Sequence, residues 1–249
     1  MKQRVWLGGR DLEFEGEQGD IYFANIAALA QGGGERHLAR FAARHLHAAS
    51  VCLDIGANIG LTTASLALAC PKAHVYAFEP STRKAMRLRS NLSANRLSNA
   101  TVVECPATAE SGSRAVMDTI DNWSASVSSP VDFIRLNVEG NEAKVLAGAA
   151  ETLVRDRPVI FMEFNSVAIA FEARRSPLSF AETIWGLFDV FVVDEDGRLW
   201  ERDARAFVLD NMLRHNCIDD IVLDLKPDQD ARSIRDALAV EFRAECAAA

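Results

Sequence analysis

The chain has 249 residues, of which 49% are hydrophobic and 25% are charged, which is ordinary for a globular protein and excludes a disordered or fibrous one. The formal net charge is -8 and no long run of lysine or arginine occurs, so we expect no nucleic-acid partner. No stretch approaches the roughly 18 apolar residues of a membrane span. The five cysteines contain no CxxC pair. We therefore expect reduced thiols and a cytoplasmic protein.

Residues 1–48 predict an N-terminal cap. The segment 5–16 (VWLGGRDLEFEG) is typical of a small hairpin, and a helix leading into the first strand of the sheet is indicated by the apolar positions Leu38, Phe41, Ala42 and Leu46. The remainder, 49–249, contains no linker and no internal repeat. We expect it to form one main domain.

From residue 51 onward, short β-branched runs alternate with segments of helical period, which predicts an α/β fold. Strands are expected at 51–55, 74–79, 101–104, 131–139, 158–164 and 217–225, and helices at 59–70, 81–97, 145–154 and 229–246. The segment 188–201 has an Asp-Gly turn between two β-type runs, which indicates an antiparallel hairpin.

The strongest local signal is the glycine turn at 51–60, VCLDIGANIG. Gly56 and Gly60 allow backbone amides to approach a ligand, and the helix N-terminus that follows favours an anionic group. Asp54 stands at the carboxyl end of the strand, where a carboxylate suits a ligand ammonium group. Glu79 ends the next strand, 23 residues after Gly56, which is the spacing at which an acidic side chain accepts hydrogen bonds from a ribose.

The glycine spacing also limits the choice of ligand. It is GxxxG instead of the GxGxxG order of a dinucleotide fold, and no GxxxxGK[ST] phosphate loop occurs, which counts against NAD and ATP. An alternative is that the two glycines only close a tight turn and that Glu79 only caps the next helix.

Five blocks occur in order between about residue 50 and residue 166: DIGANIGLTT, VYAFEPS, TIDNW, DFIRLNVEGNEAKVLAGA and RPVIFMEFN. Together they resemble the FkbM family of S-adenosylmethionine-dependent methyltransferases. The resemblance implies the class I methyltransferase (Rossmann-like) fold, a mostly parallel seven-stranded sheet with a C-terminal antiparallel strand. It also implies O-methylation of a hydroxyl or carboxyl group of a sugar, glycolipid or secondary metabolite.

The same resemblance implies where the cofactor, S-adenosyl-L-methionine, is bound. The glycine turn would hold its methionine part, Glu79 its ribose, and the loop 105–107 would pass its adenine. The implied cofactor-binding residues are Asp54, Gly56, Ala57, Asn58, Gly60, Glu79, Pro80, Ser81, Cys105 and Pro106.

One residue departs from the family pattern. The family usually has Asp in the block that reads LNVEG here, where this chain has Asn137. A neutral amide orients a hydroxyl but cannot take its proton, so the change predicts an altered rate or substrate if that Asp is the base. It also leaves open a catalytically silent accessory protein that only binds the cofactor. An NAD-dependent oxidoreductase is a third alternative. The sequence argues against it, because the third glycine and an obvious catalytic dyad are missing.

The expected strand 131–139 carries the candidate catalytic residues. Period-two alternation puts Arg135, Asn137 and Glu139 on one face, although a central parallel strand is normally apolar on both faces. Because the carboxyl end of this strand borders the ligand crevice, Glu139 is our first candidate for the general base. Asp121 is the second.

Structural roles remain alternatives for the same residues. Arg135 and Glu139 could form an ion pair, Glu142 could cap the following helix, and Asp121 could be a turn residue.

Three further residues are expected to contact the acceptor: Glu163 and Asn165, which end the fifth strand, and His215, which follows the hairpin. Glu139, Glu163 and Asn165 would also suit Mg²⁺, but nothing in their spacing demands a metal, so no metal site is predicted. We expect a small-molecule or carbohydrate acceptor as the partner. The sequence leaves the oligomeric state open.

Overall fold

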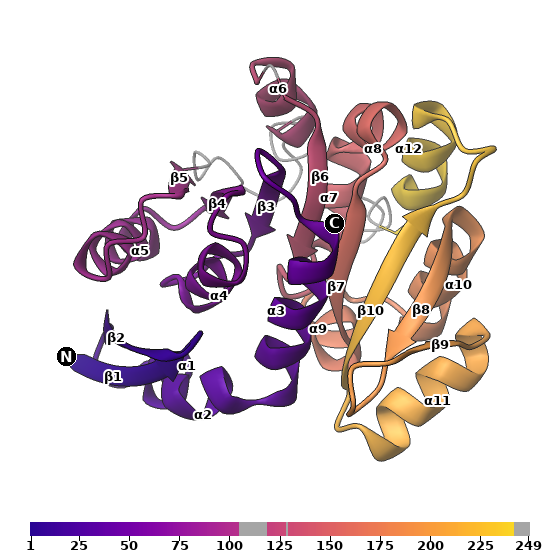
Figure 1. Ribbon diagram of the computed structural model, residues 1–249. Coiled ribbons are helices and arrows are strands. Elements are labelled where there is room, and N and C mark those ends of the chain that lie inside the picture. The colour runs from indigo at the N-terminus through magenta and orange to yellow at the C-terminus, as the bar shows by residue number, and fades with distance from the viewer. Residues whose placement is uncertain (105–118, 128, 242–249) are drawn as a thin grey trace. The chain divides into compact units, whose positions relative to one another are not determined.

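The computed structural model describes residues 1–104, 119–127 and 129–241 (Figure 1). The chain divides into two compact units. The first is built from Met1–Ala107, Asp132–Arg135 and Glu195–Gly197, and the second from Thr108–Val131, Leu136–Asp194 and Arg198–Ala249. The first unit includes the predicted cap together with the first strands of the sheet. A separate domain at residues 1–48 stays a prediction.

The first unit contains a parallel sheet. Its strands β3 (Val51–Ile55), β4 (His74–Glu79) and β5 (Ala100–Glu104) pair in the order β5-β4-β3. Every residue of β3 is buried, as expected for a central parallel strand. The helices α4 (Leu61–Ala69) and α5 (Thr82–Ala94) follow β3 and β4. This arrangement brings the carboxyl ends of β3 and β4 to one edge.

The predicted N-terminal hairpin is also present in the first unit. Its strands are β1 (Lys2–Leu7) and β2 (Arg10–Glu15), paired antiparallel. Alternate residues along the hairpin are buried, which gives it one apolar face. The helices α1 (Ile21–Ala24), α2 (Ile26–Gln31) and α3 (Gly33–His45) follow, and the four apolar positions predicted for the helix before β3 are all buried.

The second unit has an antiparallel set of strands. β7 (Val159–Asn165), β10 (Ile218–Leu225), β8 (Phe188–Val193) and β9 (Leu199–Glu201) pair in the order β7-β10-β8-β9. Its helices are α6 (Thr119–Ala125), α7 (Glu142–Gly148), α8 (Ala150–Asp156), α9 (Ser166–Phe171), α10 (Pro177–Leu187), α11 (Ala204–Arg214) and α12 (Ala231–Ala239). The predicted α/β fold and the hairpin are confirmed, and the short strand β9 adds to the seven expected.

Several boundaries differ from the prediction, three of them in ways that bear on the site or on the end of the chain. β6 (Val131–Leu136) ends three residues early because Glu139 and Gly140 adopt left-handed backbone angles, with φ of 52° and 94°, that a strand does not allow. The apolar stripe 145–154 is two helices that meet at Ala149. The terminal helix α12 covers 231–239, and residues 242–246 of the prediction lie outside the described residues.

Candidate functional site

Backbone hydrogen bonds fix the glycine turn between β3 and α4. The amides of Gly56 and Ala57 both donate to the carbonyl of Phe78 at 3.0 Å, and the Gly60 amide donates to the carbonyl of Ala57 at 2.9 Å. Gly60 has φ of 101°, and a Cβ there would lie 2.5 Å from Cδ1 of Leu88. Residue 60 therefore needs glycine both for its backbone angle and for the close packing of α5.

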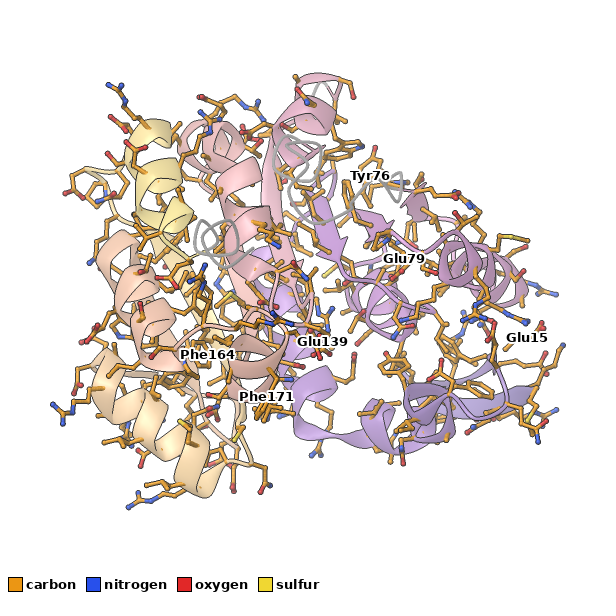
Figure 2. All side chains as sticks on the ribbon, turned by 180° about the vertical axis from the view of Figure 1, so that it is seen from behind. Glu15, Tyr76, Glu79, Glu139, Phe164 and Phe171 are labelled. Carbon is orange, nitrogen blue, oxygen red and sulfur yellow. The ribbon has the colours of Figure 1, made fainter. Side chains whose placement is uncertain are left out.

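The Glu79 carboxylate, whose side chain is labelled in Figure 2, ties this turn to the start of α5. Its Oε2 accepts from the Asn58 amide and its Oε1 from the Ser81 amide, both at 2.9 Å. The side chain is buried. Each carboxylate oxygen can accept two hydrogen bonds, so one position per oxygen is left for a ligand hydroxyl. The structure thus gives Glu79 a role in the fold, and ribose binding stays a prediction.

Asp54 is the second buried carboxylate beside the turn, with an exposed fraction of 0%. Its Oδ2 accepts from the hydroxyls of Thr62 at 2.9 Å and Thr63 at 2.6 Å, in the first turn of α4. Its Oδ1 lies 3.7 Å from Nη1 of Arg135, which also donates to the carbonyl of Gly56 at 3.3 Å. Asp54, near the end of β3, thereby contacts both α4 and the guanidinium group of Arg135.

Two oxygen atoms around the turn lack a hydrogen-bond donor among the described residues. Oδ1 of Asp54 and Oδ1 of Asn58 are buried and make no hydrogen bond to any residue that the structure describes. A buried acceptor without a donor is costly. Since the ammonium group of a methionine moiety is a hydrogen-bond donor, these residues fit such a group.

The other predicted cofactor residues are less informative. Ser81 is the N-cap of α5, and its Oγ accepts from the Lys84 amide at 3.4 Å. Pro80 is exposed beside it. Cys105 and Pro106 lie outside the described residues.

In the second unit, the loop after β6 carries Asn137 and Glu139. The sequence analysis placed both on the strand, and this was wrong because β6 ends at Leu136. Glu142 organises the loop: its Oε1 accepts from the amides of Val138 at 3.1 Å and Gly140 at 3.3 Å. Burial raises the pKa of Glu142. Glu142 thus binds amides of the loop before α7, whereas the alternative named in the sequence analysis was a cap of the helix itself.

Glu139 and Asn165 come together at the end of β7. Nδ2 of Asn165 donates to Oε2 of Glu139 at 3.3 Å, while Oδ1 of Asn165 accepts from the amides of Val167 and Ala168 at the start of α9. The Glu139 side chain is exposed. The amide of Asn165 thus holds a solvent-accessible carboxylate in place. Glu163 lies on the same face of β7, two residues before Asn165.

Asp121 has structural contacts on both oxygens. Oδ1 accepts from the amide and the hydroxyl of Thr152, and Oδ2 accepts from the Glu151 amide and pairs with Arg235 at 3.0 Å. These contacts cap the N-terminus of α8 and join α6 to α12. A role as the base stays a prediction, and these contacts leave little capacity for it.

His215 lies at the same end of the strands as Asn165, because Ile218 of β10 pairs with Asn165 of β7. Its Nδ1 is 2.8 Å from Oδ1 of Asp219. The second oxygen of Asp219 accepts from Nδ2 of Asn211, which is fully buried. Burial raises the pKa of Asp219. Sequence reasoning missed Asp219 and Asn211, although the four-residue spacing between His215 and Asp219 was a usable signal.

A comparison with known families finds a match for part of the chain. The family model described as the methyltransferase FkbM domain matches residues 113–190. This match covers less than half of the chain, and over it the chain is similar to that domain. The match supports an S-adenosylmethionine-dependent methyltransferase, as the resemblance implied.

Solved structures support the fold of this methyltransferase. A putative rRNA-methylase from Clostridium thermocellum is 15% identical with a TM-score of 0.50, covering 78% of this chain and 95% of that one. A fibrillarin pre-rRNA processing protein from Methanococcus jannaschii is 18% identical, also with a TM-score of 0.50, covering 90% of this chain and 82% of that one. No curated protein matches the sequence.

The matched range includes Asp121, Glu139 and Glu163, which the sequence analysis named as candidate site residues, and it leaves out the glycine turn and Glu79. Among the described residues, no group of three or more His, Cys, Asp or Glu side chains could hold a metal ion. Within the same residues, no helix combines the length and the apolar character that crossing a membrane requires.

Proposed function

We propose that this methyltransferase is an O-methyltransferase. Its acceptor would be a hydroxyl or carboxyl group of a sugar, glycolipid or secondary metabolite, and it would act in the cytoplasm without a nucleic-acid partner. The observation that carries the proposal is the exposed Glu139 carboxylate, which Asn165 holds at the end of β7. A positioned carboxylate is the group that an oxygen acceptor needs, because its proton must leave as the methyl group arrives.

The glycine turn is the proposed cofactor site. Residues 56–60 would hold the methionine part, with Oδ1 of Asp54 and Oδ1 of Asn58 accepting from its ammonium group. Glu79 would use its remaining acceptor positions for the ribose hydroxyls. When bound, S-adenosylmethionine supplies an electrophilic methyl group.

On the acceptor side, Glu139 would take the proton of the acceptor hydroxyl. General-base catalysis of this kind contributes about 10²- to 10⁴-fold to the rate. Asn137, in the same loop, would orient the acceptor oxygen without taking a proton. Glu163 and Asn165 would position the acceptor and Glu139.

A second proton acceptor is favoured by a specific contact. Asp219 is fixed by Asn211, and it holds Nδ1 of His215 at 2.8 Å. In this arrangement the other ring nitrogen of His215 would be the one available to an acceptor.

A thermal-shift titration with S-adenosylmethionine, S-adenosylhomocysteine and NAD tests the cofactor site. A ligand at 100 times its Kd adds about 2.7 kcal/mol to the free energy of unfolding. For a chain of this size, each added kcal/mol raises Tm by roughly 2 to 4 °C. We expect a shift with both adenosyl ligands and none with NAD. The Glu79→Ala variant should lose most of that shift.

The O-methyl acceptor is tested by S-adenosylhomocysteine release with hydroxylated and carboxylated sugars, glycolipids and secondary metabolites. Turnover with an oxygen acceptor would support the proposal. Tight cofactor binding without turnover on any of them would instead favour a catalytically silent accessory protein, as Asn137 allows.

A further inference from the structure

The N-terminal hairpin is bound to α5 by two asparagine side chains, both buried. Oδ1 of Asn95 accepts from the Glu13 amide at 2.9 Å, and its Nδ2 donates to the Glu13 carbonyl at 2.8 Å. One helical turn earlier, Oδ1 of Asn91 accepts from the Glu15 amide at 2.8 Å, and its Nδ2 donates to the Glu15 carbonyl at 3.1 Å. Each side-chain amide thus pairs with one β2 residue as a neighbouring strand would.

The spacing of the helix and the strand permits this match. Four residues of a helix rise about 6 Å, and two residues of a strand span about 6.8 Å. Asn91 lies in α5 and Asn95, four residues later, is its C-cap, while Glu13 and Glu15 are two apart on β2. Both asparagines therefore reach the same edge of the hairpin.

The two asparagines differ in their third contact. Nδ2 of Asn95 donates to the carbonyl of Asn91 within α5, at 2.8 Å. Nδ2 of Asn91 donates to the carbonyl of Ile59 at 2.9 Å. Ile59 belongs to the glycine turn and precedes Gly60, the N-cap of α4. Of the two asparagines, Asn91 is therefore the one that connects the hairpin to the turn.

The amide of Asn91 has no freedom to rotate. An asparagine side chain has one oxygen and two N–H donors, and here the oxygen and both donors are engaged. Leu88, three residues earlier and on the same face of α5, lies under Gly60. The helix thus contacts the turn at two successive residues, 59 and 60.

We propose that Asn91 is a positioning residue of the cofactor site, which couples the glycine turn to the N-terminal hairpin. The proposal rests on the glycine turn being the place where the cofactor binds. Asn91 fixes the Ile59 carbonyl, and through it the backbone that presents Asn58 and Gly60 to the ligand. Because coupling is reciprocal, binding at the turn also stabilises the contact between Asn91 and β2.

Two matched variants, Asn91→Ala and Asn95→Ala, test the proposal. Each removes three hydrogen bonds, two of them to β2, and only the first releases the turn. The Kd of S-adenosylhomocysteine is measured by calorimetry at a temperature where circular dichroism shows both variants folded. We expect Asn91→Ala to weaken binding by about fivefold or more, and Asn95→Ala by less than about twofold.

Equal weakening by both variants, or no weakening by Asn91→Ala, would overturn the proposal. Glu79→Ala separates this from a failure of the site itself: if Glu79→Ala also leaves the Kd unchanged, the glycine turn is not the cofactor site.

A measurement on the unaltered chain avoids any loss of folding in the variants. Amide hydrogen exchange is followed by NMR with and without saturating S-adenosylhomocysteine. We expect slower exchange at the Glu15 amide, which binds Asn91, and a smaller change at the Glu13 amide, which binds Asn95. The same exchange rates at Glu15 in both conditions would overturn the coupling.

Discussion

At the scale of single residues, Glu139 is the side chain on which the proposed chemistry depends most. It is exposed, and Asn165 donates to it at 3.3 Å. Glu139→Gln keeps the size and the hydrogen-bonding oxygen but cannot take a proton. With an identified acceptor, we expect kcat to fall by about 10²- to 10⁴-fold while the Kd of S-adenosylhomocysteine stays unchanged. Unchanged kcat would exclude Glu139 as the base and direct attention to His215.

Gly60 is the residue whose replacement should most disturb the turn. Its φ of 101° and its contact with Leu88 both oppose a side chain, so Gly60→Ala should lower the free energy of unfolding by about 2 kcal/mol or more. Gly9→Ala is the matched control, because Gly9 also has a positive φ, of 81°, but no atom lies within 4 Å of an added Cβ. Urea denaturation of both variants measures the difference. An equal loss in the two would show that packing against Leu88 contributes nothing.

At the scale of elements, Asp121 joins three helices. It caps α8 through Glu151 and Thr152 and pairs with Arg235 of α12. Asp121→Ala removes the acceptor of the buried Thr152 amide and one of the two carboxylates that Arg235 contacts, so we expect a loss of about 1 to 3 kcal/mol in the free energy of unfolding. Turnover by the folded variant should be retained. A large fall in kcat with unchanged stability would restore Asp121 as a candidate base.

The free energy of unfolding should depend on pH through Glu142, the first residue of α7, which binds amides of the loop after β6. Burial raises the pKa of this carboxyl in the folded state, so the folded state favours the protonated form. The contribution of Glu142 to stability is therefore full below the pKa of the unfolded chain and is lost as pH rises through the folded pKa.

Glu142→Gln cannot ionise and should escape that loss. Its free energy of unfolding relative to the unaltered chain should increase from about pH 4 to about pH 7, as measured by urea denaturation. Glu172→Gln, at an exposed position after α9, is the control. A difference between Glu142→Gln and the unaltered chain that does not vary with pH would contradict this explanation.

The sequence predicts local elements well and distant side-chain partners poorly. β3, the glycine turn, β4 with Glu79 at its end, and the Ser81 cap follow from patterns within about 30 residues. The binding of Asn91 to Glu15 joins positions 76 residues apart and has no local signature. The early end of β6 also escaped prediction, because the alternation of residues 131–139 does not reveal the left-handed angle at Glu139.

At the scale of the whole molecule, the net charge of -8 bears on the class of acceptor. A polyanion binds proteins largely through lysine and arginine contacts to its phosphates. We expect no binding of single- or double-stranded RNA at low salt, measured by fluorescence anisotropy with S-adenosylhomocysteine present. Binding that weakens steeply with added salt would contradict this and would point to an RNA acceptor.

Asn91 of α5 and its C-cap Asn95 also affect whether the hairpin can associate with other chains in solution. An open strand edge is a template on which another chain can add a strand, and proteins commonly protect such edges. Asn91 and Asn95 occupy the amides and carbonyls of Glu13 and Glu15 on the edge of β2. Since these groups are already paired, intermolecular strand addition there is blocked, and the hairpin is protected against aggregation by two side chains of a helix.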